Sequence, residues 1–272
     1  MRRASADQRW SRSVVDVAAP AKGTRPEGAG SEVEASRKVR EMFTRIAPRY
    51  DLLNHLLSLE FDRLWRARTA RRLRPILDRG DARVLDLCCG TGDLAVALYR
   101  RAKARIAGAD FAHSMLVRAR HKTAKLAVES PATRVPEIPL FEADALRLPF
   151  ADESFDLVTT AFGFRNLANY EAGLVEIRRV LKRGGTLAIL EFTEPPDNLL
   201  GHFYRWYFCK VLPKIGGAIS GDADAYSYLP TSVARFFRPD ELRALMTSVG
   251  FASVNASVWT LGTVALHTAE RR

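Results

Sequence analysis

Short apolar runs alternate with amphipathic segments over most of the chain. Runs with the length and apolar content of strands cover 83–87, 105–109, 138–142, 155–160 and 186–191. Between them, apolar residues at helical spacing begin at Asp93, Ser114 and Tyr170. Strand and helix patterns that alternate in this way predict a parallel, doubly wound α/β sheet.

The two ends of the chain add different elements to this prediction. Helical spacing precedes the first strand from Ser36 to Pro48 and at 51–58 and 61–73. After Pro239 a helix runs to Gly250, and strand patterns follow at 252–258 and 262–267. Because only a few residues separate these strands, they must pair as an antiparallel hairpin. The sequence therefore predicts a seven-stranded sheet closed by a C-terminal hairpin.

Residues 1–35 differ from the rest, because they are rich in Ala, Ser, Gly, Pro and Arg without periodicity. We expect them to form a disordered tail. Its acidic residues count against an organelle-targeting peptide. Residues 36–272 are then one domain with an N-terminal helical extension on the substrate side.

The chain of 272 residues is basic, with a formal net charge of +11 at pH 7. Such a surface suits anionic lipid headgroups or nucleic acid. Much of the excess lies in 63–79, where a solvated helix face is the simplest interpretation. No apolar run has the length of a membrane-spanning helix and no secretory signal is recognisable, so we expect a cytoplasmic protein.

The first strand pattern ends in a glycine turn that reads Asp86-Leu-Cys-Cys-Gly90-Thr91-Gly92-Asp93. Glycines at these positions allow backbone to approach a ligand closely, and the following helix presents unpaired N–H groups. The spacing also fits a dinucleotide fingerprint, but a pyrophosphate would meet the charges of Asp86 and Asp93. S-adenosylmethionine carries cationic groups and no phosphate, so this acidic turn favours it over NAD or ATP.

The next two strand patterns also end in acidic residues. Asp110 follows Gly90 by 20 residues, the interval at which a carboxylate reaches a ribose diol, and Phe111 beside it could lie against adenine. Asp144 could accept from the adenine amino group, and the Ala145 N–H could donate to the ring. Coincidence is a poor explanation for three successive acidic strand ends.

The cysteines and histidines give no sign of a disulfide framework or a metal site. Cys88 and Cys89 are adjacent, and with Cys209 alone they lack metal-ligand spacing. None of the 5 histidines forms a metal motif with nearby acids. We therefore propose no metal.

Several longer motifs are more specific than the glycine turn. They are YDLLN at 50–54 followed by Leu57-Ser58 and Trp65, RVLKRGG at 179–185 with EFT at 191–193, FGFRN at 162–166, and GDADAYSYL at 221–229. On these motifs, nearly all of 36–272 resembles the ubiquinone and menaquinone biosynthesis C-methyltransferases.

The resemblance implies a class I, Rossmann-like methyltransferase fold that uses S-adenosylmethionine to methylate a ring carbon of a prenylated quinol. Thr91, Asp110, Asp144 and Ala145 match the family's cofactor-contacting positions. The chain departs from the family pattern at Leu53 (usually Met), Asp62 (usually His), Ala161 (a cofactor-contacting Ser in relatives), Arg183 (usually Pro) and Thr193 (usually Ser). Asp62 matters most, because it changes charge and proton-donor ability near the expected quinol.

Ring methylation requires an electron-rich carbon, which a hydroquinone supplies when it ionises, and a base that afterwards removes the ring proton. Arg165 is the candidate for stabilising the oxyanion, and a structural ion pair is its alternative. Asp222, Asp224, Tyr226 and Tyr228 are candidate proton acceptors or hydroxyl anchors. A solvated acidic loop with packed tyrosines explains that segment equally well.

A prenylated quinol lies in a bilayer, so we expect the protein to associate peripherally with an anionic membrane surface. The segment 202–212, with Phe203, Trp206 and Phe208, suits an interfacial helix or a lid, and a core helix is its alternative. We expect no nucleic-acid partner and allow for a homodimer. A Rossmann oxidoreductase fits poorly with the acidic turn and the hairpin. The serious alternative is a methyltransferase for another small apolar or lipid acceptor.

Overall fold

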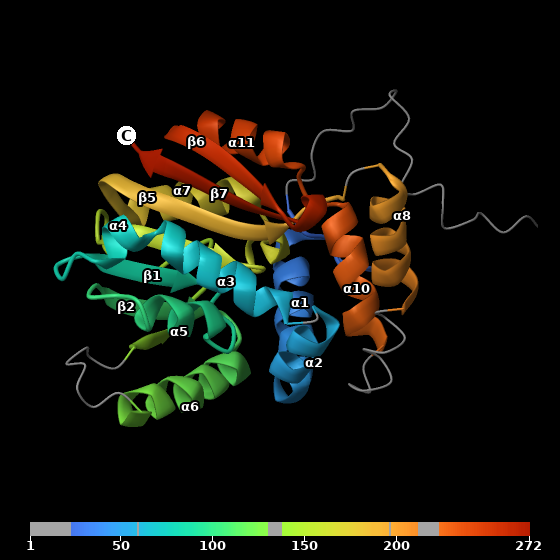
Figure 1. The fold of residues 1–272 in the computed structure, drawn as a ribbon, viewed down its shortest axis with the longest axis horizontal. Helices are drawn as coiled ribbons and strands as arrows, with labels where there is room; N and C mark the ends of the chain where they lie inside the picture. Colours follow the sequence, from blue (N-terminus) through green and yellow to red (C-terminus); the bar gives the residue numbers. More distant parts are fainter. Residues whose placement is uncertain (1–22, 59, 130–137, 196, 212–222) are drawn as a thin grey trace, which may run out of the picture.

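The computed structural model describes residues 23–58, 60–129, 138–195, 197–211 and 223–272 (Figure 1). A single sheet crosses the molecule in the order β3-β2-β1-β4-β5-β7-β6. Its strands are β1 (Arg83–Leu87), β2 (Arg105–Asp110), β3 (Leu140–Glu142), β4 (Phe155–Ala161), β5 (Leu181–Phe192), β6 (Phe251–Trp259) and β7 (Val264–Arg271).

The direction of the strands confirms the predicted fold class. β1 pairs in parallel with β2 and β4, and β3 and β5 extend the parallel part on either side. β7 is antiparallel to both β5 and β6, which makes the last two strands the predicted hairpin. The order reverses between β1 and β4, and ligands of doubly wound sheets bind at such a switch point.

Helices cover both faces of the sheet because successive strand residues point to opposite sides. Val84 and Leu157 pack beneath one group of helices, whereas Leu85 and Val158 pack beneath the other. The first group is α3 (Phe61–Arg72), α4 (Arg74–Leu77), α5 (Asp93–Tyr99) and α6 (His113–Glu129). The second is α7 (Tyr170–Val180) and α11 (Pro239–Ser248).

A cap of helices lies beyond the carboxyl ends of the parallel strands, at the right in Figure 1. Apolar side chains of its first and last helices, including Met42 and Val233, pack with Met115 of α6. The cap consists of α1 (Glu32–Ile46), η2 (Ala47–Arg49), α2 (Tyr50–Leu57), α8 (Leu199–Trp206), η4 (Tyr207–Val211) and α10 (Ala223–Ala234). Two short turns, η3 (Phe164–Asn166) and η5 (Thr260–Gly262), complete this edge of the sheet. None of the described helices is both long and apolar enough to cross a bilayer.

The start of the domain differs from the predicted boundary at residue 35. α1 begins at Glu32, capped by the Ser31 hydroxyl, and the residues before it pack against the fold. The Thr24 amide donates to the Leu167 carbonyl at 2.8 Å. Gly23 lies so close to Ala168 that an added Cβ would be 1.9 Å from the carbonyl oxygen of that residue. We call residues 23–25 the N-terminal strap. The prediction for 1–22 lies outside the described residues.

The sequence also placed the start of β5 five residues too late. The strand begins at Leu181, and its pairing with β4 shifts register between Phe155 and Leu157. Gly184 within it has φ +72°. An irregular, glycine-containing strand does not show the regular alternation that the sequence reading requires.

Candidate active site

A cleft of about 870 Å³, its open mouth included, lies at the carboxyl ends of β1, β2 and β4 under the helical cap. The strand order brings the predicted residues together, because parallel strands end at the same edge. Gly92 does not line the cleft but caps α5. Predicted residues that do line it are Asp86, Gly90, Thr91, Asp110, Phe111, Asp144 and Ala145.

The glycine turn needs unusual backbone conformations. Gly90 and Gly92 have φ +55° and +86°, in the left-handed region that side chains disfavour. Cys88 adopts φ +52° despite its side chain. Its Cβ lies where Gly163 leaves room, since a Cβ on Gly163 would be 2.4 Å away. The glycine of the FGFRN motif therefore accommodates the turn between β1 and α5.

Asp110 is held at the end of β2 by backbone donors. Its two carboxylate oxygens accept from the Gly90 and Ala112 amides, each at 2.9 Å. Burial raises the pKa of Asp110 to about 6, although these hydrogen bonds oppose the shift. The side chain is thus fixed toward the cleft and retains lone pairs for a further donor.

Asp86 at β1 has an unsatisfied oxygen. Its Oδ1 accepts from the Thr159 hydroxyl at 2.9 Å, whereas buried Oδ2 has no hydrogen-bond partner among the described residues. Burial raises the pKa of Asp86 to about 7. A buried carboxyl with an unsatisfied oxygen favours a cation or a hydrogen-bond donor beside it.

The negative charge of Asp93, which we expected to repel a pyrophosphate, is compensated by neighbouring cations. Its carboxylate contacts Lys122 and lies 3.6 Å from the Arg66 guanidinium. These cations hold the pKa of Asp93 below its ordinary value although burial opposes them. Because the charge of Asp93 is compensated, the argument against a pyrophosphate rests on Asp86 alone.

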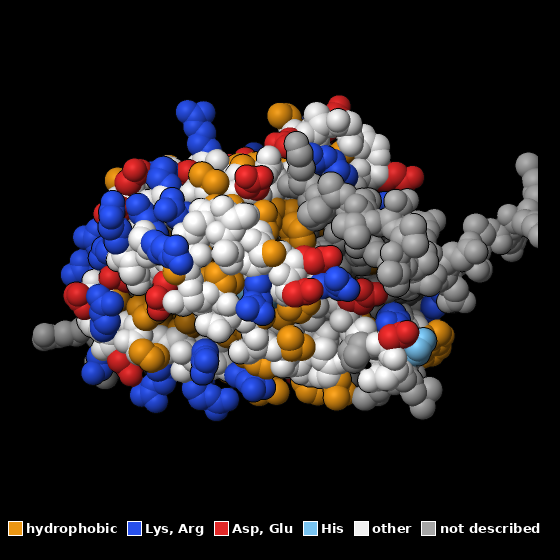
Figure 2. All heavy atoms as spheres, turned by 90° about the horizontal axis from the view of Figure 1, so that it is seen from above, with side chains coloured by type: hydrophobic (Ala, Val, Ile, Leu, Met, Phe, Trp, Pro, Cys, Tyr) orange, Lys and Arg blue, Asp and Glu red, His pale blue; other side chains and the backbone are white. Residues whose placement is uncertain are grey.

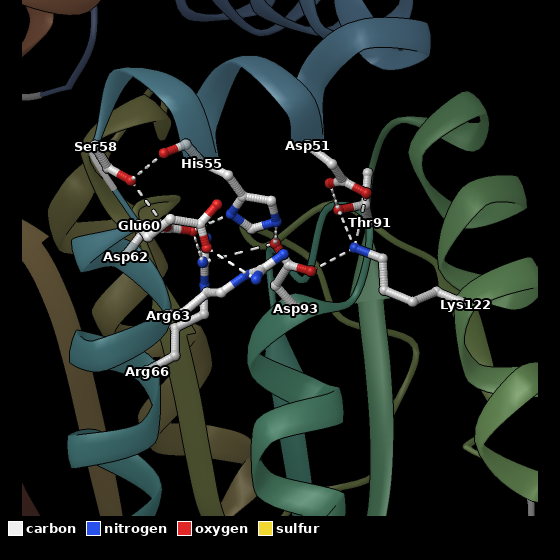
Figure 3. A network of polar contacts seen from close by, with 10 residues as sticks. All are labelled: Asp51, His55, Ser58, Glu60, Asp62, Arg63, Arg66, Thr91, Asp93 and Lys122. Carbon is white, nitrogen blue, oxygen red and sulfur yellow. Dashed lines mark hydrogen bonds and ion pairs between the residues drawn. The ribbon is translucent and has the colours of Figure 1, made fainter. Parts of the chain in front are cut away.

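The same cations belong to a network that links the cap to the glycine turn (Figure 3). Asp51 of α2 accepts from the Thr91 hydroxyl and forms a 2.8 Å ion pair with Lys122. His55, one turn later, contacts Asp62 of α3 through Nδ1 at 2.7 Å. Thus the helix that closes the cleft is joined by polar contacts to the turn beneath it.

His55, Asp62 and Asp93 form a cluster that the sequence search for metal sites missed. Their ligand atoms all lie within 4.8 Å of one another. Arg66, however, donates to Asp62 and faces Asp93, and together with Lys122 it supplies the cluster's positive charge. Although burial opposes it, Arg66 holds the pKa of Asp62 below its ordinary value. A metal ion would have to displace these cations, so we assign none.

Arg165 lies beside the cleft rather than in its lining. Its Nη1 forms a buried 3.2 Å ion pair with Glu191 and donates to the Phe162 carbonyl. Its Nε donates to Ser232 of α10 at 3.4 Å, and Nη2 has no hydrogen bond among the described residues. Burial raises the pKa of Glu191, an effect that the charge of Arg165 opposes. The oxyanion role of Arg165 stays a prediction.

The remaining predicted catalytic residues are only partly described. Asp222 lies outside the described residues, while Asp224 and Tyr226 lie on α10 with side chains that are not described. The structure adds Tyr50 and Asn166, which line the cleft. Tyr50 belongs to the YDLLN motif, which carries the family resemblance but by itself indicates no contact with a ligand.

A hydrogen-bonded chain fixes one wall of the cleft. The Thr24 hydroxyl and Tyr228 phenol are 2.8 Å apart, and Tyr228 donates to Asn166 Oδ1 at 3.0 Å. This arrangement sets the orientation of the Asn166 amide. The N-terminal strap therefore contributes to the site from residues that carry no sequence motif.

The chain is similar to known proteins over most of its length. Residues 31–271 match the model of the ubiE/COQ5 methyltransferase family. The chain is 49% identical over 231 residues to a demethylmenaquinone methyltransferase of Thermus thermophilus, which spans 85% of this chain and 100% of that protein. It is 41% identical over 240 residues to a ubiquinone/menaquinone biosynthesis C-methyltransferase of Geotalea daltonii, covering 88% and 98% respectively.

The solved structures show the fold. A SAM-dependent methyltransferase from Thermotoga maritima superposes with a TM-score of 0.58 at 21% identity, over 86% of this chain and 100% of that one.

Proposed function

The chain belongs to the ubiE/COQ5 methyltransferase family, and on that premise we propose which of its residues bind S-adenosylmethionine and methylate a quinol. The enzyme is a C-methyltransferase of menaquinone or ubiquinone biosynthesis. The proposed acceptor is prenylated, and the proposed reaction converts demethylmenaquinol to menaquinol. The observation that carries the assignment is an acidic cleft in which a buried oxygen of Asp86 has no hydrogen-bond partner in the described part of the chain.

The residues of the cleft fit the cofactor. Asp110, fixed by two amides, would accept from the ribose diol, and Asp86 would face a cationic or donor group. Asp144 and Ala145, at the end of β3, would bind the adenine, with Phe111 against the ring. Bound S-adenosylmethionine supplies an electrophilic methyl group on a sulfonium.

The protein's own part in the reaction is to orient the acceptor and to manage its protons. A quinol that loses its hydroxyl proton gains electron density at the neighbouring ring carbon, and a base must later take the proton from that carbon. Arg165 is our candidate for the oxyanion, because Nη2 has no hydrogen-bond partner among the described residues and its neighbours Phe162 and Asn166 line the cleft. We keep Asp222, Asp224 and Tyr226 as candidates for proton transfer.

Methyl transfer from labelled cofactor tests the function directly. Demethylmenaquinol and demethoxyubiquinol-type acceptors should be compared, each as a short-tailed soluble analogue and as a long-tailed quinol in vesicles. We expect methylation of at least one quinol at a ring carbon. Transfer to another apolar acceptor, with neither quinol methylated, would favour the alternative class.

We also propose that the enzyme works at the membrane surface. Trp206 of α8 is 54% exposed, which agrees with the predicted interfacial segment, while the side chains of Phe203 and Phe208 are not described. The variant Trp206→Ser should then reduce turnover of long-tailed quinols more than of short-tailed ones. Equal losses would assign α8 another role. A homodimer stays a prediction that light scattering of the purified protein tests.

A further inference from the structure

A shallow groove runs between α3–α4 and the edge strand β6, on the far side of α3 from the network of Figure 3. Four arginines line it together with Pro75 and the outer residues of β6. Arg68 lies over the Trp259 ring, 4.6 Å from its centroid, and thereby joins the helix to the strand. The lining residues are Arg68, Arg71, Arg72, Arg74, Pro75, Asp78, Ser257, Val258 and Trp259.

The charge of this groove is little compensated. Asp78 is its acidic lining residue and lies 3.5 Å from Arg74. Arg71 and Arg72 are exposed and form no ion pair with any described residue. At the opposite end of the strands, in contrast, the cations are paired with acids. Lys182 forms a 2.8 Å ion pair with Asp156, and Arg271 forms a 2.9 Å ion pair with Glu153.

Exposed apolar side chains occur on the same two elements, α3 and the β6–β7 hairpin. Leu64 and Phe61, one turn apart on α3, are 55% and 42% exposed, and Val258 in the groove is 51% exposed. Leu261, at the tip of the hairpin, is 67% exposed. The hairpin tip is bound to α3, since Trp65 donates to the Thr260 hydroxyl at 2.7 Å. Figure 2 shows Lys and Arg side chains along the lower rim of the molecule, where apolar side chains adjoin them.

A row of aromatic rings leads inward from this surface. Phe61 stacks on Trp65 with ring centroids 6.1 Å apart, and Trp65 lies 5.9 Å from Phe162. Phe162 lines the cleft, and Phe192 packs on it at 4.6 Å. A continuous row of aromatic side chains therefore joins the exposed apolar surface to the cleft wall, with the Arg66 guanidinium over the Phe162 ring.

We propose that this surface, which we call the α3–β6 face, is where the protein docks on an anionic lipid bilayer. The inference rests on the proposed function, because a prenylated acceptor must be drawn from lipid. The arginines bind phosphate-bearing headgroups, while Leu64, Phe61 and Leu261 enter the headgroup region beside them. The prenyl tail of the quinol follows the aromatic row from the bilayer to the cleft.

Nucleic acid is the other polyanion that a groove of arginines could bind. The apolar residues favour lipid, because a phosphodiester backbone leaves Leu64 and Leu261 exposed to water. A bilayer instead covers charge and apolar surface in the same contact. The two partners also differ in salt dependence, since only insertion into lipid leaves binding that resists salt.

The test is flotation of the full-length protein with vesicles of phosphatidylglycerol and phosphatidylcholine, at low and high salt. The triple variant Arg68→Gln/Arg71→Gln/Arg72→Gln should lower the partition coefficient at low salt at least tenfold. A charge-matched control is Arg118→Gln/Arg120→Gln/Lys125→Gln on α6, at the opposite edge of the sheet, which should bind within twofold of the wild type. Leu64→Gln/Leu261→Asn should remove the salt-resistant part. Thermal unfolding verifies that each variant is folded.

The outcomes separate this proposal from the function on which it rests. If the triple variant binds vesicles as well as its control, the α3–β6 face is not the docking surface. Stronger binding of an RNA duplex than of vesicles, lost in the triple variant, would also overturn it. The proposed function is tested separately by wild-type methylation of a short-tailed quinol in solution. The triple variant should retain that activity and lose turnover of the long-tailed quinol in vesicles.

Discussion

Replacing Asp110 by asparagine tests the cofactor site most directly, because the carboxylate has a defined geometry and a perturbed pKa. Both oxygens accept from backbone amides. Asparagine fits the same space, but its amide group, a donor, would face one of these backbone donors. At pH 8 the variant should bind S-adenosylmethionine more weakly by ~1.5–3 kcal/mol, the range for a hydrogen bond to a charged group. This corresponds to a dissociation constant larger by roughly 10- to 150-fold.

The pH dependence of the wild type is the second half of this prediction. Burial raises the pKa of Asp110 to about 6, so the carboxyl is ionised at pH 8 and mostly neutral at pH 5. If only the ionised form accepts from the ribose, the dissociation constant scales as 1 + 10^(pKa − pH). Protonation of Asp110 alone should therefore raise the dissociation constant about 11-fold at pH 5 relative to pH 8, which is ~1.4 kcal/mol of binding free energy. Asp86, whose pKa burial raises to about 7, should steepen the loss.

Titration calorimetry between pH 5 and 8 measures both effects, and comparison of buffers with different ionisation enthalpies reveals the proton released on binding. Asp240→Asn provides a control, because its carboxylate is exposed on α11. An affinity that does not change between pH 5 and 8 in the wild type would refute the reasoning. So would a folded Asp110→Asn variant with wild-type affinity.

Further substitutions test the other buried groups. Asp86→Asn should stabilise the ligand-free protein at pH 8 by up to ~4 kcal/mol and change it little at pH 4, as measured by thermal unfolding. The reason is that burial raises the pKa of Asp86 to about 7, so the native state loses stability as the pH rises from about 4 through 7. Arg165→Met should lower the free energy of unfolding by ~3–5 kcal/mol, because it leaves Glu191 buried without its ion-pair partner. The double variant Arg165→Met/Glu191→Gln should recover most of this stability. In that double variant, retained cofactor affinity with reduced kcat would support the oxyanion role, whereas an unchanged kcat would exclude it. Thr24→Val should lower the free energy of unfolding by ~1 kcal/mol and raise the acceptor KM, because Tyr228 loses one of its two hydrogen-bond partners and keeps Asn166. Thr24→Ser should restore both values, and an unchanged KM in Thr24→Val would remove the N-terminal strap from the acceptor site.

The sequence predicted the strands well, and most of the candidate cofactor residues lie in one cleft, because strand patterns and strand ends are local features. β1 was placed at its observed bounds, and Asp86, Asp110 and Asp144 meet because parallel strands share a carboxyl edge. This convergence follows from fold class alone and needs no side-chain detail. For the same reason, the parallel sheet and its closing hairpin could be anticipated.

The partners of charged residues were much harder to predict, because they come from distant segments. Lys122 neutralises Asp93 from 29 residues away, and Glu191 binds Arg165 from 26. The N-terminal strap was also missed, since Thr24 meets Tyr228 across 204 residues of sequence. No periodicity or motif marks such pairs, and only the packed fold determines them.

The contact between His55 and Asp62 has a consequence for how the family diversifies. A ring nitrogen of His55 and a carboxylate oxygen of Asp62 lie 2.7 Å apart, and exchanging the two residue types between α2 and α3 would keep an acid–histidine contact, although Arg66 would lose its carboxylate partner on α3. Relatives that carry histidine at the position of Asp62 are therefore expected to carry an acid at the position of His55. The two positions should change together during descent, and a chain with histidine at both would place two rings where Arg66 already supplies positive charge.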